Sequence, residues 1–275
     1  MAIPGVMRLV AATSLLAIAY GPQGALAQQA PAPASAGKPA PAVIEDLVAA
    51  NRILADQQVL DAYGHVSIRH PANPQRFLMG RNLAPALVKA EDIVEYDLEG
   101  NAIGAPAGFT HFLERFIHAE IYKARADANA VVHSHSPAII PFGATQAPLK
   151  PMYHIAAFLS PTVPVFEIRK AAGGMTNMLV GDGKLGKSLA EVLGPNNVAL
   201  MRGHGNVVVA PTLPLVVFRA VYTEVNARLQ AQAIAIGGPI TFLDPEEAEK
   251  ANKVLDQIHG RAWDLWKRKA MEQKP

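Results

Sequence analysis

Strand-like and helix-like stretches alternate from about residue 43 to the end of the chain, and this mixture constrains the fold more than any other feature. Apolar residues at helical spacing predict helices over residues 43–61, 112–126, 183–193, 213–236 and 245–269, and Pro137 is placed to open a further helix. Short β-branched or alternating runs predict strands over residues 65–69, 77–79, 93–96, 130–135, 198–201 and 206–209. The pattern indicates an α/β domain in which a sheet packs against layers of helices.

Composition narrows the function more than the fold. The chain has 275 residues, half of them hydrophobic, so it can bury a sizeable core. Its formal net charge is +2 and it has no long run of Lys or Arg, so a nucleic-acid partner is not indicated. It contains no cysteine, which excludes disulfides, thiolate metal sites and cysteine nucleophiles. A tightly held metal must therefore be bound by His, Asp or Glu.

The N-terminus has the pattern of a secretory signal. Arg8 precedes an apolar stretch over residues 9–20, and Ala25-Leu26-Ala27 offers small residues where a signal peptidase cleaves. The alternative is a membrane anchor, but the apolar stretch is short for a bilayer span. We expect residues 1–27 to be removed and the protein to be exported to the periplasm or secreted, with no membrane association afterwards. The mass of the mature chain should then correspond to a start near Gln28.

A linker and a single domain follow. Residues 28–42 are rich in Pro and Ala and are expected to form a flexible or polyproline-like linker. The catalytic domain is expected to cover residues 43–275.

Three histidines are candidate metal ligands. His133 and His135 lie two residues apart on a predicted strand, so both rings should project from one face; alternatively they are a polar pair at a strand end. His204 lies in a turn between two glycines, which permit a close backbone approach, although an ordinary turn histidine is the alternative. Three imidazoles with one open position are typical of catalytic zinc. We expect one divalent ion per chain, zinc first, with manganese, iron and cobalt as alternatives.

Glu114 is the candidate acid/base. It lies in the predicted helix before the His133 strand, among the apolar residues Phe112, Leu113 and Phe116. Such surroundings should raise the pKa of a carboxyl group, unless a cation or metal holds it ionised. The alternative is a surface Glu114 that pairs with Arg115 or His118.

Four short motifs together resemble the class II aldolase/adducin family. They are Gly64-His65-Val66-Ser67, Leu113-Glu114-Arg115, the segment NAVVHSH at 129–135, and Arg202-Gly203-His204-Gly205. The resemblance covers residues 43 to about 240. It implies a mainly antiparallel sheet between helical layers and a homotetramer with sites at subunit interfaces.

The same resemblance assigns roles residue by residue. It implies that His133, His135 and His204 hold the metal and that Glu114 is the acid/base. Residues 152–157 resemble the segment that carries the family's proton-donating tyrosine, which implies Tyr153, within its own subunit or across an interface. The alternative for Tyr153 is a core or interface aromatic residue.

The sequence departs from the sugar-phosphate aldolases where those enzymes hold phosphate. Phe112 and Leu113 stand where they have a Ser-Ser pair, His65 replaces an Asn, and Arg81-Asn82 corresponds to a Thr-Gly turn. A phosphate needs several hydrogen-bond donors, so a phosphosugar substrate is not favoured. We expect Arg81, with help from His65, to bind the carboxylate of a small acid. The alternative is an Arg81 that pairs with Asp92 or Glu95.

Decarboxylation is the leading interpretation of these features. The chain looks most like the branch that decarboxylates hydroxylated aromatic or pyridine carboxylic acids. A metal would act as a Lewis acid, and loss of carbon dioxide would leave an enolate or phenolate that Glu114 or Tyr153 protonates. Retro-aldol cleavage of a non-phosphorylated hydroxy-oxo substrate uses the same protein groups and remains an alternative. A non-catalytic scaffold like the adducin head is less favoured, because those members lose the metal histidines and this chain has all three.

Overall fold

An eight-stranded sheet forms the centre of the domain in the computed structural model, which describes residues 1–2 and 34–272. The strand order is β4-β3-β2-β1-β5-β8-β7-β6. The strands are β1 His65–Arg69, β2 Arg76–Gly80, β3 Ile93–Asp97, β4 Ala102–Ile103, β5 Ala130–Ser134, β6 Val165–Phe166, β7 Val198–Met201 and β8 Gly205–Ala210. Neighbouring strands pair antiparallel except β6 and β7, which are parallel. The sheet is therefore mixed and mostly antiparallel, in agreement with the expected fold class.

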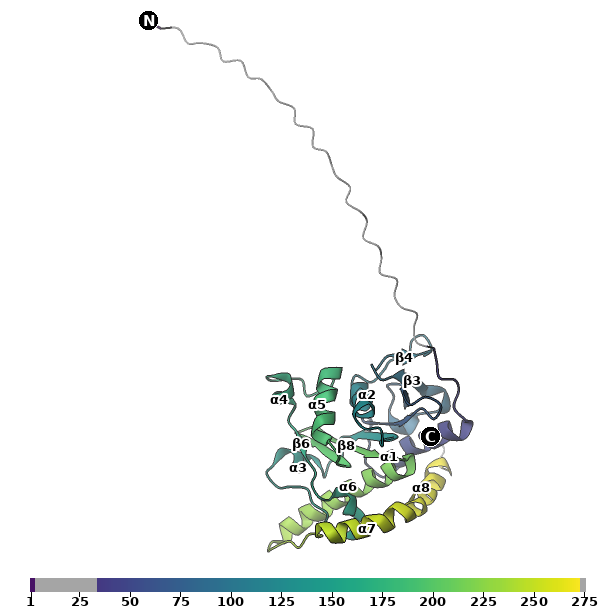
Figure 1. The fold of residues 1–275 in the computed structure, drawn as a ribbon, viewed down its shortest axis with the longest axis vertical. Helices are drawn as coiled ribbons and strands as arrows, with labels where there is room; N and C mark the ends of the chain where they lie inside the picture. The colour runs from purple at the N-terminus through teal and green to yellow at the C-terminus, as the bar shows by residue number, and fades with distance from the viewer. Residues whose placement is uncertain (3–33, 273–275) are drawn as a thin grey trace. The chain divides into compact units, whose positions relative to one another are not determined.

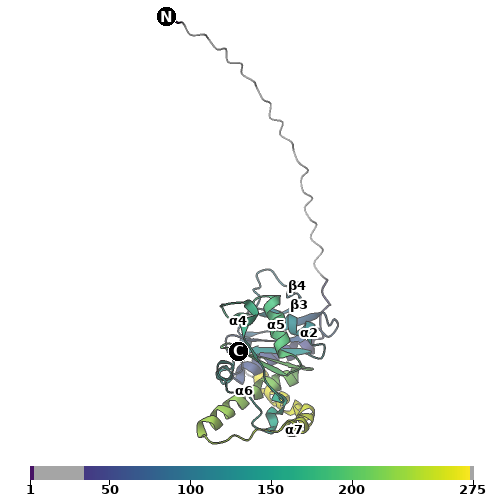
Figure 2. The same cartoon turned by 60° about the vertical axis from the view of Figure 1, so that its left-hand side comes forward.

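Helices cover both faces of this sheet. They are α1 Pro41–Asp56, α2 Arg115–Ala124, α3 Ile140–Ala144, α4 Ile168–Ala172, α5 Gly183–Leu193, α6 Leu213–Ile236, α7 Pro245–Ile258 and α8 Gly260–Glu272. Short 3-10 turns occur at η1 Pro85–Leu87, η2 Ala90–Asp92 and η3 His154–Leu159. Figures 1 and 2 show α2, α4 and α5 on one side of the sheet and α6 with α7 on the other.

The two faces of the sheet have separate hydrophobic cores because side chains alternate along each strand. On β5, Ala130 and Val132 pack with α1 and α6, whereas Val131 packs with α2 and α5. Strand β5 is buried along its whole length, as is its neighbour β8. The strand that carries His133 and the strand that follows His204 are therefore held from both sides.

Several element boundaries differ from the sequence expectation. The single helix expected over 245–269 is two helices, because α7 ends at Ile258 and α8 begins at Gly260, a residue that disfavours a helix interior. Helix α2 begins at Arg115, so Glu114 occupies the position just before it rather than lying inside it, and its side chain makes no capping hydrogen bond. The helix expected to open at Pro137 begins at Ile140.

The N-terminal expectations fall largely outside the described residues. The signal peptide and linker residues 28–33 cannot be compared with the structure, and both stay predictions. Helix α1 begins at Pro41, where proline fits the first turn. Ahead of it, Ser35 Oγ and the Ala36 N–H both donate to the Glu95 carboxylate, so residues 35–36 contact the domain.

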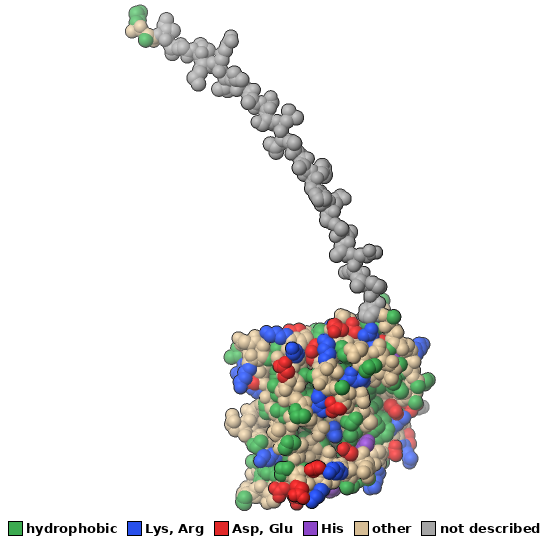
Figure 3. Space-filling model, viewed as in Figure 1, with side chains coloured by type: hydrophobic (Ala, Val, Ile, Leu, Met, Phe, Trp, Pro, Cys, Tyr) green, Lys and Arg blue, Asp and Glu red, His purple; other side chains and the backbone are tan. Residues whose placement is uncertain are grey.

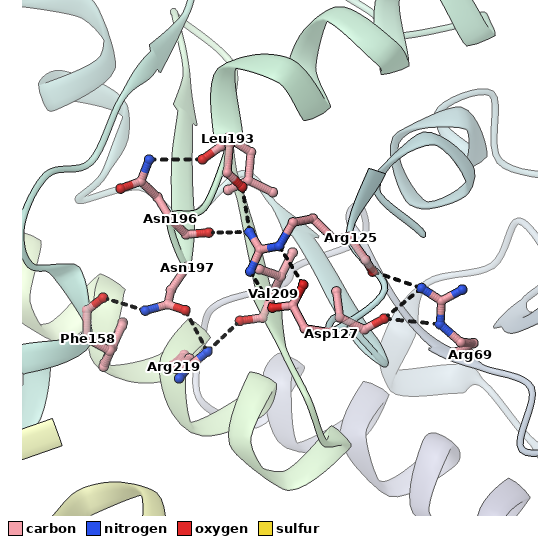
Figure 4. Close-up of polar contacts among 11 residues, drawn as sticks. Arg69, Arg125, Asp127, Phe158, Leu193, Asn196, Asn197, Val209 and Arg219 are labelled. Carbon is pink, nitrogen blue, oxygen red and sulfur yellow. Dashed lines mark hydrogen bonds and ion pairs between the residues drawn. The ribbon is translucent and has the colours of Figure 1, made fainter. Parts of the chain in front are cut away.

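Three arginines bind backbone carbonyls around the turn before β5 and the neighbouring strand β8 (Figure 4). Arg69 donates to the backbone carbonyls of Tyr122, Arg125 and Ala128. Arg125 donates to the carbonyls of Gly194 and Asn196 and to Asp127. Arg219 donates to the Val209 carbonyl and to Asn197. The bonds of Arg69 and Arg125 hold the turn before β5, from which the strand runs to His133.

The surface has mixed charge. On the face shown in Figure 3, acidic and basic side chains are interspersed without a broad area of either sign. Among the described residues, no helix combines the length and apolar character that a membrane span requires.

Candidate metal centre

Glu114 and the three predicted histidine ligands converge at one point. One ligand atom from each of Glu114, His133, His135 and His204 lies within 4.8 Å of the others. His133 lies on β5 and His135 immediately follows it. His204 lies in the turn between β7 and β8, and pairing of His133 with Val207 brings that turn beside the histidines of β5. The structure thus places together the four residues that the sequence predicted as one centre.

The two glycines beside His204 allow its turn to pack closely against β5. Gly203 has φ +62°, a left-handed conformation that favours glycine. A Cβ atom at Gly205 would collide with the backbone carbonyl of Ser134. The sequence Gly-His-Gly is therefore what allows the turn to approach close enough for His204 to face His135.

Backbone carbonyls orient two of the imidazoles. His133 Nδ1 lies 3.0 Å from the Asn206 carbonyl oxygen, and His204 Nδ1 lies 3.0 Å from that of Met178. A carbonyl only accepts hydrogen bonds, so each Nδ1 carries a hydrogen and each Nε2 is the ring nitrogen that remains for a ligand. This is the usual outer-shell arrangement of a metal-binding histidine.

The inward-facing nitrogens fit a divalent cation. The His133 Nε2 is buried and has no hydrogen-bond partner among the described residues. The Nε2 atoms of His135 and His204 lie 3.0 Å apart. Burial, with lesser contributions from His133 and His204, lowers the pKa of His135 to about 4, so this ring is neutral at pH 7, the form that binds metal. Three imidazole nitrogens that converge in this way suit a metal ion, which would also give the buried His133 Nε2 a partner.

Glu114 is ionised in this centre. Its Oε2 lies 3.4 Å from His133 Nε2 and 3.5 Å from His204 Nε2, and its Oε1 accepts a 2.9 Å hydrogen bond from the Val180 N–H. Burial alone would raise the pKa of this carboxyl, but the contacts with His133 and His204 outweigh burial and lower it. Arg115 donates instead to the carbonyls of Gly100 and Phe112. The ion pair between Glu114 and Arg115, which the sequence left open as an alternative, is therefore not found among the described residues.

His65 lies beside the centre with partners that the sequence analysis did not identify. Its ring centroid is 5.1 Å from that of His133 and 4.6 Å from that of Phe112. His65 Nδ1 lies 2.6 Å from His118 Nε2, and His118 in turn contacts Ser67. The sequence did contain a pattern that predicts this cluster, because residues 65 and 67 share one face of a strand and residues 118 and 122 share one face of a helix.

Tyr153 and Arg81 lie apart from the four converging residues. Tyr153 packs with the hydrophobic core on the opposite face of the sheet, and its buried hydroxyl has no hydrogen-bond partner among the described residues. Arg81 Nε donates to Asp92 Oδ1 over 2.7 Å, and its guanidinium lies over the Phe109 ring at 5.0 Å. For Arg81 the structure shows the ion pair that the sequence offered as the alternative.

Comparisons with known proteins agree with this geometry. Residues 45–231 match the family described as the class II aldolase and adducin N-terminal domain. The chain is 34% identical over 251 residues to "Decarboxylase tropJ" of Talaromyces stipitatus, covering 84% of this chain and 94% of that protein. It is 30% identical to a 3,4-dihydroxyphthalate decarboxylase of Arthrobacter keyseri, covering 74% of this chain and 84% of that enzyme. An L-fuculose 1-phosphate aldolase structure from Glaciozyma antarctica shares the fold, with a TM-score of 0.69, 24% identity, and coverage of 86% of this chain and 94% of that one.

Proposed function

Since the chain belongs to the class II aldolase and adducin family, we propose that it is a divalent-metal-dependent carbon–carbon lyase that decarboxylates a hydroxylated aromatic or related carboxylic acid. The observation that carries this proposal is the convergence of three imidazoles with a buried Glu114 whose pKa is lowered. The named activities of two relatives, both decarboxylases, support the same reaction class.

The protein groups have distinct tasks in this reaction. His133, His135 and His204 would hold the metal, which supplies Lewis-acid stabilisation for negative charge that develops on the substrate. Glu114 is ionised and so can accept a proton from a substrate hydroxyl. When carbon dioxide leaves, the electron pair stays on the substrate carbon, and Glu114 can return the proton there.

Apolar side chains beside the centre favour a flat substrate over a phosphosugar. The Phe112 ring packs 4.6 Å from the His65 ring, at a position where sugar-phosphate aldolases have a hydroxyl. A phosphate needs several donors, whereas a hydroxylated ring needs a hydrophobic surface and a few polar contacts.

Release of carbon dioxide tests the proposal directly. Zinc-loaded and manganese-loaded protein should release carbon dioxide from hydroxylated benzoic, phthalic or pyridine carboxylic acids, and chelation should abolish the release. Sugar phosphates should inhibit poorly. Aldehyde formation from hydroxy-oxo acids without carbon dioxide release would instead identify the retro-aldol alternative. Absence of both activities in the metal-loaded protein would contradict a lyase of either kind.

Tyr153 can take part in the proposed reaction only if several copies of the chain assemble. In its own chain it packs on the face of the sheet opposite the metal centre. We propose a homotetramer in which Tyr153 reaches the site of a neighbouring subunit, where it is the alternative to Glu114 as the donor of the proton to the substrate carbon. Sedimentation of a fully active monomer would remove Tyr153 from the mechanism.

Arg81 is proposed to bind a substrate carboxylate with the part of its guanidinium that Asp92 does not use. The Asp92 bond engages Nε, and no hydrogen bond of either Nη atom is found among the described residues. Arg81→Lys keeps the charge but loses the planar fork, so the KM for an acid substrate should rise about tenfold while metal content stays unchanged. The control is Arg76→Lys, whose arginine pairs with Glu95 on the neighbouring strand. Equal kcat/KM in the two variants would leave Arg81 as a structural ion-pair partner only.

A further inference from the structure

Four buried side chains form one continuous hydrogen-bonded chain next to the metal centre. His65 Nδ1 lies 2.6 Å from His118 Nε2, and His118 Nδ1 lies 2.6 Å from Ser67 Oγ. Ser67 Oγ lies 2.8 Å from the Tyr122 hydroxyl oxygen. The relative exposures are 3% for His65, 0% for Ser67 and His118, and 2% for Tyr122. Water therefore has little access to these groups, and the chain must satisfy its own hydrogens.

The series of hydrogen bonds ends at Tyr122, and this end determines which atom donates in each bond. Among the described residues, the Tyr122 hydroxyl has Ser67 Oγ as its one hydrogen-bond partner. If Tyr122 donates to Ser67, then Ser67 donates to His118 Nδ1, and every hydroxyl hydrogen has an acceptor. If His118 Nδ1 instead donated to Ser67, one of the two hydroxyl hydrogens would have no acceptor. An unsatisfied buried donor is unfavourable enough to disfavour that arrangement by about tenfold or more.

The same donor-to-acceptor order continues from Ser67 through His118 to His65. Burial, with a smaller effect of His133, lowers the pKa of His118 to about 3, so its ring is neutral and carries one hydrogen. Because His118 Nδ1 accepts from Ser67, that hydrogen is on Nε2 and is donated to His65 Nδ1. His65 Nδ1 is then an acceptor, and a neutral His65 carries its own hydrogen on Nε2.

We propose that His118, Ser67 and Tyr122 fix His65 as the Nε2–H tautomer, so that it donates a hydrogen bond to an oxygen of the bound substrate. His65 is thereby a substrate-binding residue, and His118 and Ser67 are positioning residues that act through it. The role toward substrate rests on the proposed function, because it requires a substrate oxygen at the metal centre.

The position of His65 fits this role. Its ring centroid lies 4.8 Å from that of His118 and 5.1 Å from that of the ligand His133. No hydrogen bond of its Nε2 is found in the described part of the chain, and this atom is not among the buried atoms that lack a partner. The Nε2–H is therefore left for a group that enters the site. A neutral donor suits a carboxylate or phenolate oxygen and leaves the ligand histidines to the metal.

Nitrogen NMR of the zinc-loaded protein without substrate tests the tautomer. With 15N-labelled histidine, His65 should show a protonated Nε2 and an unprotonated Nδ1. Ser67→Ala removes the donor to His118, and His118→Phe removes the donor to His65 while keeping a ring. Both variants should give a mixture of the two His65 tautomers. A protonated Nδ1 in the wild-type protein, or a pure Nε2–H form in both variants, would overturn the proposal.

Two further variants distinguish the direction of the hydrogen bonds from an effect of altered side-chain packing. Tyr122→Phe should keep the Nε2–H form, because Ser67 still needs His118 as an acceptor; a mixture of tautomers in this variant would show that Ser67 does not direct its hydrogen to His118 and would contradict the proposal. His118→Gln should also keep it, because an amide N–H can still donate to His65.

Kinetics then tests the role of His65 toward substrate. His118→Phe should raise KM about tenfold or more with a smaller change in kcat and unchanged zinc content, and His118→Gln should restore KM. If wild-type His65 is the Nε2–H tautomer but KM is unaltered in His118→Phe, the hydrogen bond from His65 to the substrate is excluded. Because the NMR needs no substrate, an incorrect substrate class would leave the tautomer result intact.

Discussion

Replacing His204 with alanine is expected to remove the metal from the protein and to abolish turnover. His204 supplies one of three converging imidazoles, and its Nδ1 is already committed to the Met178 carbonyl. Loss of an outer-shell partner typically weakens metal binding 10- to 100-fold, so loss of a ligand should weaken it by at least ~100-fold. Metal analysis should fall from about one ion per chain to near zero, and His133→Ala and His135→Ala should behave alike.

Thermal unfolding gives an independent measure of the same site. Added zinc at about 100-fold above its Kd should stabilise the wild-type protein by roughly 2.7 kcal/mol, and the alanine variants should show little of this gain. His154→Ala is the matched control, because His154 is an exposed histidine of η3, on the side of the sheet away from the centre. Full metal occupancy in all three ligand variants would rule out this centre.

Glu114→Gln is expected to keep the metal and lose the reaction. Glutamine has nearly the same shape and can still accept the Val180 N–H, but it neither takes nor returns a proton. Removal of a positioned acid/base typically lowers kcat by ~10² to 10⁴. Steady-state kinetics on a responsive acid, with metal content measured on the same sample, should show this loss at near-normal metal occupancy.

Glu120→Gln is the matched control for this change. Glu120 lies on α2, the helix that Glu114 immediately precedes, but it pairs with Lys123 rather than with the histidines of the centre. Its kcat should stay within about twofold of wild type, as expected for an exposed ion pair of little energetic weight. A Glu114→Gln enzyme with near-normal kcat would exclude Glu114 as the acid/base.

The sequence by itself determined the class of the fold and the four residues of the centre. Apolar runs of period two and repeats of period 3.6 depend on local geometry, and these predicted β1, β5, β8 and α6 close to their observed bounds. His133 and His135 at the end of one strand, and His204 between two glycines, are equally local patterns. Strands β4 and β6 have two residues each and the short helix α4 has five, too few for any period to appear, and they were not predicted.

Only the tertiary structure decided how these groups act on one another. Sequence left the pKa of Glu114 open in direction, because the pairing of β5 with β8 is what places His133 and His204 against its carboxylate. It also left open that Arg81 pairs with Asp92 and that Tyr153 lies on the opposite face of the sheet. The chain from His65 to Tyr122 needs β1 and α2 in contact, residues about fifty apart in sequence. Such properties depend on distances that packing sets, and no local pattern of residues carries them.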